Sequence, residues 1–245
     1  MKELRTMQAA RLYGIRDLRL EDLPRPTPGS GEVLLKVASV GICGSDVHYY
    51  LEGRIGNQVV TAPIIMGHEF SAWVADFGEG VEGLEIGQLV AVEPAISCGE
   101  CEPCRHGHPN LCPNVRFCGT PPVDGVLAEY TVIPGANCFP LLQGFGPAEG
   151  AMLEPLGVAI HAVDLAHLRL GYTVAVLGAG PIGLLIAAVR SYRSRWHPRP
   201  WPPRRSTARW DQPPARRRYT LASGGPGQRR GWRYPTVPAA RPPRG

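Results

Sequence analysis

The sequence lacks the segments that would place a protein in a membrane or carry it across one. No run of 18 or more apolar residues occurs in its 245 residues, so we expect no transmembrane helix. The N-terminal stretch MKELRTMQAARLYG has no apolar segment of the kind found in a signal peptide. We therefore expect a cytoplasmic protein whose seven cysteines are metal ligands or reduced thiols, not disulfides.

Lysine is absent from the last part of the chain, where arginine and proline dominate. Residues 190–245 hold fifteen Arg, eleven Pro, four of the five Trp and one acidic residue, Asp211. Such a segment cannot supply the apolar strands and amphipathic helices of a folded domain, so we expect a disordered tail. A coding region read in a shifted frame is our leading explanation. The alternative is a genuine basic tail that binds acidic surfaces or nucleic acid without specificity.

Residues 1–189 have the opposite charge balance, with 20 acidic and 11 basic residues, although the whole chain carries +5. Short β-branched and apolar runs separated by Gly and Pro predict an antiparallel, barrel-like β domain. The expected strands are residues 7–13, 17–21, 32–40, 70–78, 88–93 and 127–133. A short helix capped by Ser45 or Asp46 should follow Gly44, and residues 147–168 should be helical with a break at Pro155.

The most specific motif is a cysteine cluster with the spacing C-x2-C-x2-C-x7-C, formed by Cys98, Cys101, Cys104 and Cys112. Closely spaced cysteines let one loop wrap a tetrahedral ion, and four thiolates complete its coordination shell. The spacing therefore predicts a structural zinc site, with an iron–sulfur cluster as the alternative. Cys118 and Cys138 have no comparable neighbours, and we interpret them as ordinary core or loop residues.

A second candidate metal site is spread over the stretch GICGSDVHYYLEGRIGNQVVTAPIIMGHE at residues 41–69. It offers Cys43, His68 and Glu69, whose thiolate, imidazole and carboxylate groups are good zinc ligands. Three protein ligands leave a fourth position open, as a catalytic zinc requires. Taken alone, Cys43 could equally be a small buried apolar residue.

A glycine-rich loop follows the apolar run TVAVL at residues 173–177. It reads GAGPIG, with Gly178, Gly180 and Gly183 in the G-x-G-x-x-G pattern and Pro181 and Ile182 between the last two. The glycines permit a tight turn and the close approach of a pyrophosphate to a helix N-terminus. Because a predicted strand precedes the loop and a predicted helix follows it, we interpret it as a dinucleotide-binding loop.

Together these motifs resemble the zinc-containing medium-chain dehydrogenase family, and within it the sorbitol (polyol) dehydrogenase branch. The residues that carry the resemblance are GICGSDVHYY at 41–50, GHE at 67–69, the cysteine cluster, EPLGVAIHA at 154–162 and VAVLGAGPIG at 174–183. The resemblance covers about three quarters of the chain. It implies a mixed α/β fold with a GroES-like β-barrel catalytic domain at 1–155, the first βα unit of a Rossmann NAD-binding domain at 156–189, and an aberrant or disordered tail at 190–245.

The resemblance also implies roles for individual residues. Cys43, His68 and Glu69 match the catalytic zinc ligands, and Glu154 matches the acidic residue beside the open zinc position. Ser45 and His48 match the proton-relay positions, and Tyr49 matches a tyrosine that contacts the substrate. The implied reaction is zinc-assisted hydride transfer from a small polyol or secondary alcohol to NAD.

Two classes of function stay open at this point. One is the enzyme, with threonine and butanediol dehydrogenases as related alternatives, and with full-length relatives expected to be homo-oligomers. The other is an inactive zinc-binding fragment, because no further apolar strand and no second-strand acidic residue for the ribose follow the glycine loop.

Overall fold

The computed structural model describes residues 5–168, 172 and 174–195. The chain divides into two compact units, residues 1–169 and 170–245. No helix in the described part of the chain is both long and apolar enough to span a membrane.

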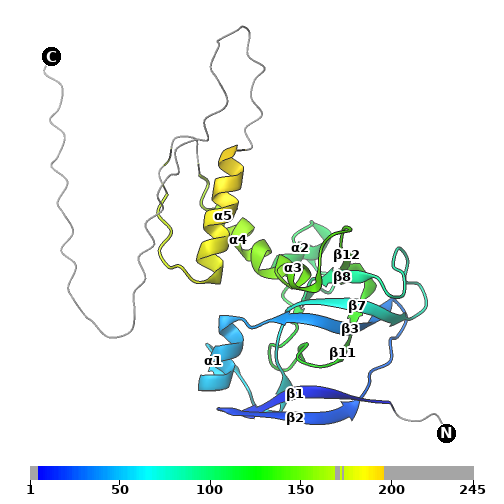
Figure 1. The fold of residues 1–245 in the computed structure, drawn as a ribbon. Helices are drawn as coiled ribbons and strands as arrows, with labels where there is room; N and C mark the ends of the chain where they lie inside the picture. The colour runs from blue at the N-terminus through cyan, green and yellow to red at the C-terminus, as the bar shows by residue number, and fades with distance from the viewer. Residues whose placement is uncertain (1–4, 169–171, 173, 196–245) are drawn as a thin grey trace, which may run out of the picture. The chain divides into compact units, whose positions relative to one another are not determined.

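The first unit is built from short antiparallel strands (Figure 1), as the sequence predicts. Its main sheet has the order β11-β3-β7-β8-β12 and its second sheet the order β2-β1-β6. The main-sheet strands are β3 (Glu32–Gly41), β7 (Glu69–Phe77), β8 (Leu89–Val92), β11 (Tyr130–Pro134) and β12 (Cys138–Pro140). The second sheet holds β1 (Thr6–Gly14), β2 (Asp17–Pro24) and β6 (Ile64–Ile65). The described part of the chain also has two two-stranded ribbons. One pairs β4 (Arg54–Ile55) with β5 (Gln58–Val59), and the other pairs β9 (Ala95–Ile96) with β10 (Arg116–Phe117).

The main sheet buries one continuous apolar core. Alternating side chains of β3 and β7 meet there, among them Val33, Leu35, Phe70 and Val74, each at most 1% exposed. A smaller cluster of Leu12, Tyr49, Ile64 and Met66 lies under the second sheet. Period-two alternation places the core side chains of β3 and β7 on one face of each strand, which explains why these strands could be predicted from sequence.

The helices depart from the sequence prediction in several details. The described helices are α1 (Gly44–Glu52), α2 (Glu102–Arg105), α3 (Pro147–Ala151), α4 (Leu153–Leu165) and α5 (Pro181–Arg195), with 3-10 turns η1 (Pro109–Leu111) and η2 (Gly135–Asn137). The break predicted at Pro155 is wrong, because the interruption lies at Met152 and Pro155 sits in the first turn of α4. Proline is tolerated there because a first-turn N–H has no partner within the helix.

Two other expectations about element ends are corrected. The N-cap of α1 is Cys43, while Asp46 lies in the first turn and accepts a hydrogen bond from the Cys43 backbone N–H at 2.9 Å. The strand predicted at 127–133 begins only at Tyr130, because Leu127 instead donates its N–H to the Met66 carbonyl at 2.8 Å.

In the second unit the glycine loop leads directly into α5, but the predicted strand before it does not form. The residues described there, 172 and 174–180, are not in a strand, and the Leu177 side chain is 95% exposed. An extended segment becomes a strand only when a neighbour pairs with it, and no described strand pairs with this one. Helix α5 continues to Arg195, past the residue at which the predicted tail begins. Residues 196–245, which make up most of that predicted tail, lie outside the described part of the chain.

The two cysteines outside the predicted metal sites lie in the main core. Burial raises the pKa of Cys118 to about 11 and that of Cys138 to about 12. At pH 8 both thiols should therefore stay protonated and react with iodoacetamide only when the domain unfolds. Mass spectrometry of alkylated peptides tests this, with the chain in denaturant, where all seven cysteines should be labelled, as the control. Rapid labelling of Cys118 or Cys138 in the folded chain would contradict their placement.

Candidate functional site

The structure brings two groups of potential metal ligands together in the first unit. One is Cys98, Cys101, Cys104 and Cys112, and the other is Cys43, His68 and Glu69. Within each group the ligand atoms lie within 4.8 Å of one another. We call them the four-cysteine group and the Cys43 group. The residues were grouped in the same way by sequence reasoning.

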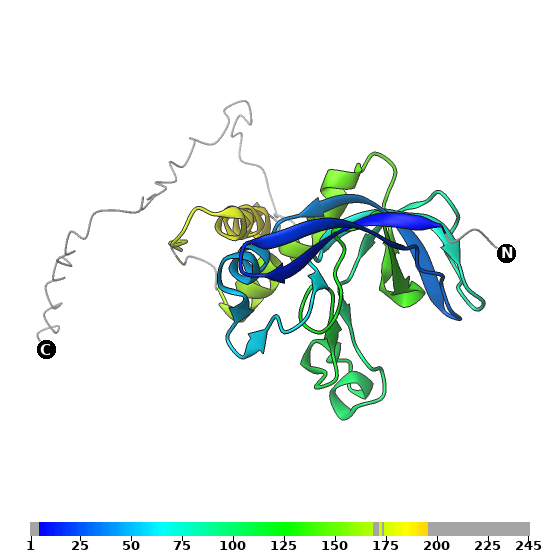
Figure 2. The ribbon, with the colours of Figure 1, turned by 90° about the horizontal axis from the view of Figure 1, so that it is seen from below.

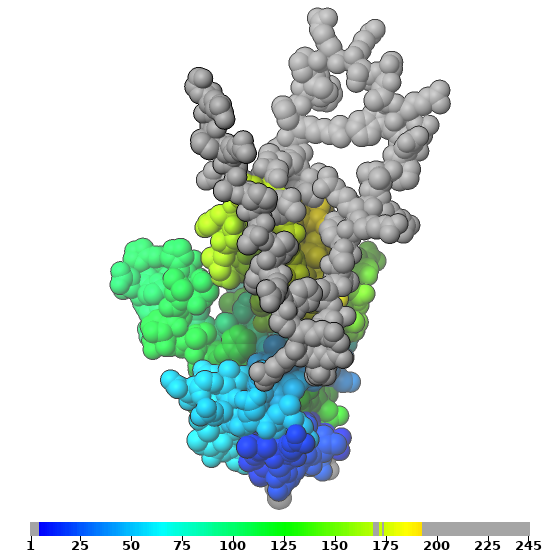
Figure 3. Space-filling model, turned by 90° about the vertical axis from the view of Figure 1, so that its left-hand side faces the viewer, coloured from blue at the N-terminus to red at the C-terminus, as the bar shows by residue number. Residues whose placement is uncertain are grey.

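The four-cysteine group lies in a lobe, residues 97–115, that projects from the β domain (Figures 2 and 3). Cys101 is the N-cap of α2, Cys104 lies within this helix, and Cys112 ends η1. Gly99 and Gly107 adopt φ values of 74° and 80°, which side chains other than glycine rarely tolerate, and so allow the turns between the ligands.

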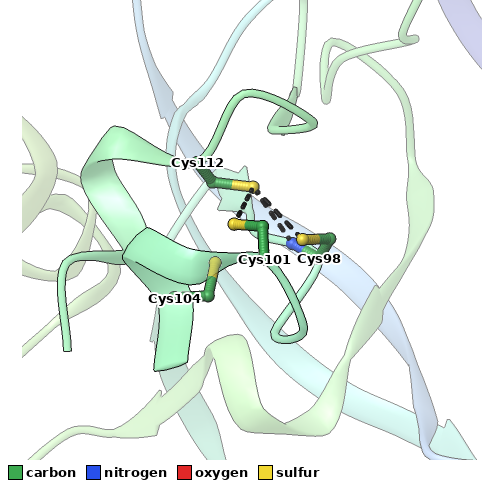
Figure 4. A group of neighbouring side chains, drawn as sticks. All are labelled: Cys98, Cys101, Cys104 and Cys112. Carbon is green, nitrogen blue, oxygen red and sulfur yellow. Dashed lines mark hydrogen bonds between the residues drawn. The ribbon is translucent and has the colours of Figure 1, made fainter. Parts of the chain in front are cut away.

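The four thiols point toward one another (Figure 4). The Cys112 sulfur lies 3.5 Å from that of Cys98 and 3.8 Å from that of Cys101. Tetrahedral zinc with bonds of about 2.3 Å would hold its sulfurs about 3.8 Å apart, so the spacing fits this ion. The backbone N–H groups of Glu100 and Cys101 lower the pKa of Cys98 to about 6. At Cys101 the Cys104 backbone N–H lowers the pKa, but burial and the neighbouring thiols together raise it to about 12. The thiolate that a metal binds therefore forms at Cys98 before it forms at Cys101.

The Cys43 group forms where β3 ends and β7 begins. Gly41, the last residue of β3, pairs with Glu69, the first residue of β7, and Cys43 lies two residues beyond the pair. A side chain at Gly41 would overlap the Glu69 carboxylate, so glycine is needed for that carboxylate to lie across the strand. The antiparallel register therefore places residues from two distant sequence positions at one point.

His68 is held in place by its surroundings. Its side chain is buried, and its ring packs against the Phe117 ring with centroids 5.2 Å apart at 59°. Its Nδ1 atom lies 3.8 Å from Oδ1 of Asp46, which is also buried. These contacts restrict the ring rotation that would turn the second ring nitrogen away from the group.

Asp46 is the functional residue that sequence reasoning missed, since it was expected only to cap a helix. Its Oδ2 accepts the Cys43 N–H at 2.9 Å and its Oδ1 accepts the Gly67 N–H at 3.1 Å. One buried carboxylate thus ties the two segments that carry the ligands. The available signal was its position three residues after Cys43, where an acidic side chain can reach back to the helix N-terminus.

Glu154, from the first turn of α4, lies close enough to the Cys43 group for the charges to interact. Burial raises the pKa of its carboxyl, the neighbouring His68 lowers it, and Glu69 raises it. The side chain is only half-buried. Its role beside the open zinc position, which the family resemblance implies, remains a prediction.

The expected relay residues Ser45 and His48 and the expected substrate residue Tyr49 differ in how exposed they are. Ser45 is half-buried in the first turn of α1, while His48 is 62% exposed and its Nδ1 contacts Glu52 at 3.1 Å. Tyr49 is 2% exposed in the smaller cluster and donates its hydroxyl hydrogen to Gln58 at 2.9 Å. Burial raises the pKa of this hydroxyl. Contact between Tyr49 and a substrate remains a prediction.

The glycine loop belongs to the second unit. Gly178 has φ of 107°, and a side chain at Gly183 would overlap the Gly178 carbonyl. Pro181 begins α5, and Ile182 follows it on the first turn, leaving the early N–H groups of the helix free of partners within it. This shape suits a phosphate, and a role for Gly180 and its neighbours in cofactor binding remains a prediction.

The fold and these two ligand groups define a zinc-type dehydrogenase catalytic domain. Residues 29–143 match the family described as "Alcohol dehydrogenase GroES-like domain". The matched residues belong to this domain family, and the similarity of the chain to individual relatives supports the zinc-containing medium-chain dehydrogenases and, within them, the sorbitol (polyol) dehydrogenase branch.

Individual relatives agree with this assignment. The chain is 44% identical over 187 residues to sorbitol dehydrogenase of Bacillus subtilis, covering 76% of this chain and 53% of that protein. It is 47% identical over 179 residues to "Probable D-xylulose reductase A" of Aspergillus fumigatus, covering 73% and 50%. A solved alcohol dehydrogenase from Escherichia coli CFT073 in complex with NADH is similar, with 36% identity, a TM-score of 0.68 and coverage of 75% and 52%. The chain spans about half the length of the curated relatives that it matches.

Removing the Asp46 carboxylate should weaken both the fold and the Cys43 group. In Asp46→Ala the N–H groups of Cys43 and Gly67 lose their acceptor, which should cost roughly 2–4 kcal/mol of unfolding free energy. Affinity of the group for zinc should fall about 10- to 100-fold, because the ligands are no longer held by an outer partner. Denaturant unfolding and zinc titration measure the two effects. Asp76→Ala, which alters an exposed carboxylate on β7, is the matched control. Equal behaviour of the two variants would contradict the role of Asp46.

Proposed function

We propose that the chain carries the metal-binding part of a zinc- and NAD-dependent dehydrogenase that oxidises a small polyol or another secondary alcohol to a ketone. The observation that carries the proposal is the convergence of Cys43, His68 and Glu69 beside Glu154. The similarity to a sorbitol dehydrogenase and to a D-xylulose reductase supports a polyol as the substrate class.

In this proposal Cys43, His68 and Glu69 hold the catalytic zinc and the four-cysteine group holds a structural one. When bound, the catalytic zinc supplies a Lewis acid that lowers the pKa of the substrate hydroxyl. A thiolate, an imidazole and a carboxylate suit zinc, and three ligands leave room for the alcohol. His68 is buried, which limits the access of water to its ring. The Glu154 carboxylate, which interacts with His68 and Glu69, would orient the substrate hydroxyl or receive its proton.

The proton that the alcohol loses needs a path to solvent. Ser45 is half-buried next to the Cys43 group, and His48, one turn of helix α1 further on, is exposed. A hydroxyl can accept and donate a proton, and an imidazole can exchange one with water. We therefore assign Ser45 as the inner and His48 as the outer member of the relay, with Glu52 in contact with the imidazole.

NAD is the proposed hydride acceptor, bound through Gly178, Gly180 and Gly183 at the start of α5. The relative that was solved with NADH supports this choice. We keep the domain boundaries at 1–155, 156–189 and 190–245 as a proposal for the folding units. The seven cysteines are free thiols in the structure, which is compatible with the reducing cytoplasm that we propose as the location. Assembly into homo-oligomers is proposed by analogy with the family.

A specific observation favours weak cofactor binding by this 245-residue chain. Residues 174–177 do not pair with any described strand, and Leu177 is 95% exposed. The turn can hold phosphates, but a fixed distance between nicotinamide and alcohol needs a supported sheet, and an error of about 1 Å can reduce the rate about a hundredfold. The inactive zinc-binding fragment is therefore the second candidate function.

The function is tested by NAD reduction with sorbitol or xylitol and by cobalt spectroscopy. We expect NAD to bind with Kd above about 1 mM and turnover to be slow and to disappear in His68→Ala. His161→Ala, which alters an exposed histidine on α4, should leave turnover unchanged.

Cobalt(II) provides a measurement that does not depend on turnover. Sorbitol should change the visible spectrum of the cobalt-loaded chain, and Cys43→Ser should remove that change. Turnover that persists in His68→Ala, or a cobalt spectrum that sorbitol leaves unchanged, would contradict the proposed function.

A further inference from the structure

The β9–β10 ribbon connects the two ligand groups. It consists of two residue pairs, Ala95 with Phe117 and Ile96 with Arg116. The lobe, residues 97–115, is the loop that closes one end of this ribbon. At the other end, Phe117 packs its ring against the His68 ring at 5.2 Å. Because the ribbon has only two residue pairs, a displacement of β10 would also move Phe117, whose ring contacts His68 of the Cys43 group.

The inner end of the ribbon is anchored in the core. The Cys118 side chain is buried, and its N–H donates to the Pro94 carbonyl at 3.1 Å. The Ala95 N–H donates to the Glu93 carboxylate at 3.0 Å. These contacts flank Phe117 on both strands. On the outer side a single residue pair, Ile96 with Arg116, separates Phe117 from the lobe, so the position of the ring also depends on whether the outer end of the ribbon is held.

The outer end has little packing of its own. Neither α2 nor η1 contains a buried residue, and Cys112 is the only residue of the lobe classed as buried in the structure. A segment without an apolar core is ordered mainly by the ion that its thiolates bind. Metal in the four-cysteine group is therefore the main source of order at the outer end of the ribbon.

We propose that Phe117 is a positioning residue through which metal in the four-cysteine group sets the metal affinity of the Cys43 group. Loss of the lobe metal frees the outer end of the ribbon and lets the Phe117 ring move. The His68 ring then keeps Asp46, at 3.8 Å from its Nδ1, but loses its packing against Phe117. The inference rests on the proposed function in one respect, because it requires that the Cys43 group binds a metal.

Cobalt(II) titration of the full 245-residue chain tests the proposal. The part of the thiolate-to-cobalt absorption that disappears in Cys43→Ser reports the Cys43 group. We expect Phe117→Leu to raise the cobalt Kd of this group about tenfold, as loss of an outer contact to a metal ligand does. Phe117→Tyr keeps the ring and should restore the affinity. Phe139→Leu, a change of a 55% exposed phenylalanine on β12, is the control.

The double variant Cys101→Ser/Cys104→Ser removes metal from the lobe and should raise the same Kd by a similar factor. Adding Phe117→Leu to it should then have no further effect, because both changes act through one contact. A Cys43-dependent signal whose Kd is unchanged in Phe117→Leu would overturn this inference and leave the proposed function standing. Absence of any Cys43-dependent signal in the unaltered chain would overturn the proposed function itself. If the double variant does not fold, the comparison of Phe117→Leu with Phe117→Tyr decides alone.

Discussion

The antiparallel pairing of β3 with β7 is the constraint on which the candidate site depends. It places Gly41 opposite Glu69 and so brings Cys43 to His68 and Glu69, 25 residues further along the chain. A shift of one residue in this register would turn Glu69 to the other face of the sheet and separate the ligands. The core stabilises this pairing, since Val33, Leu35, Phe70 and Val74 are buried together in it. The pairing of the sheet therefore also brings together the segments that carry the Cys43 group.

Two further contacts stabilise the geometry that the sheet creates. Asp46 ties the start of α1 to the backbone before His68, and the Phe117 ring packs against the imidazole ring. Both are buried or half-buried, where an electrostatic or packing contact has more effect than at the surface. The four-cysteine lobe joins this arrangement through the β9–β10 ribbon. In the proposed coupling, this ribbon lets the state of one ligand group affect the other.

Much of this could be predicted from sequence, because the signals are local. The spacing of Cys98, Cys101, Cys104 and Cys112 defines a loop around an ion, and alternation of apolar residues locates the strands of the core. The contact of Phe117 with His68 could not be predicted, because it joins segments 49 residues apart by tertiary packing. The segment 174–177 was misassigned for a related reason. Its composition suits a buried strand, but a strand also requires a neighbour, and the described part of the chain pairs none with it.

The central claim is that one β domain assembles two separate metal centres from these seven residues. Anomalous diffraction from crystals of the zinc-loaded chain, recorded on both sides of the zinc absorption edge, tests it most directly. We predict two peaks, one surrounded by the sulfurs of Cys98, Cys101, Cys104 and Cys112, and one between Cys43, His68 and Glu69. A single peak, or a second peak away from the Cys43 group, would contradict the account.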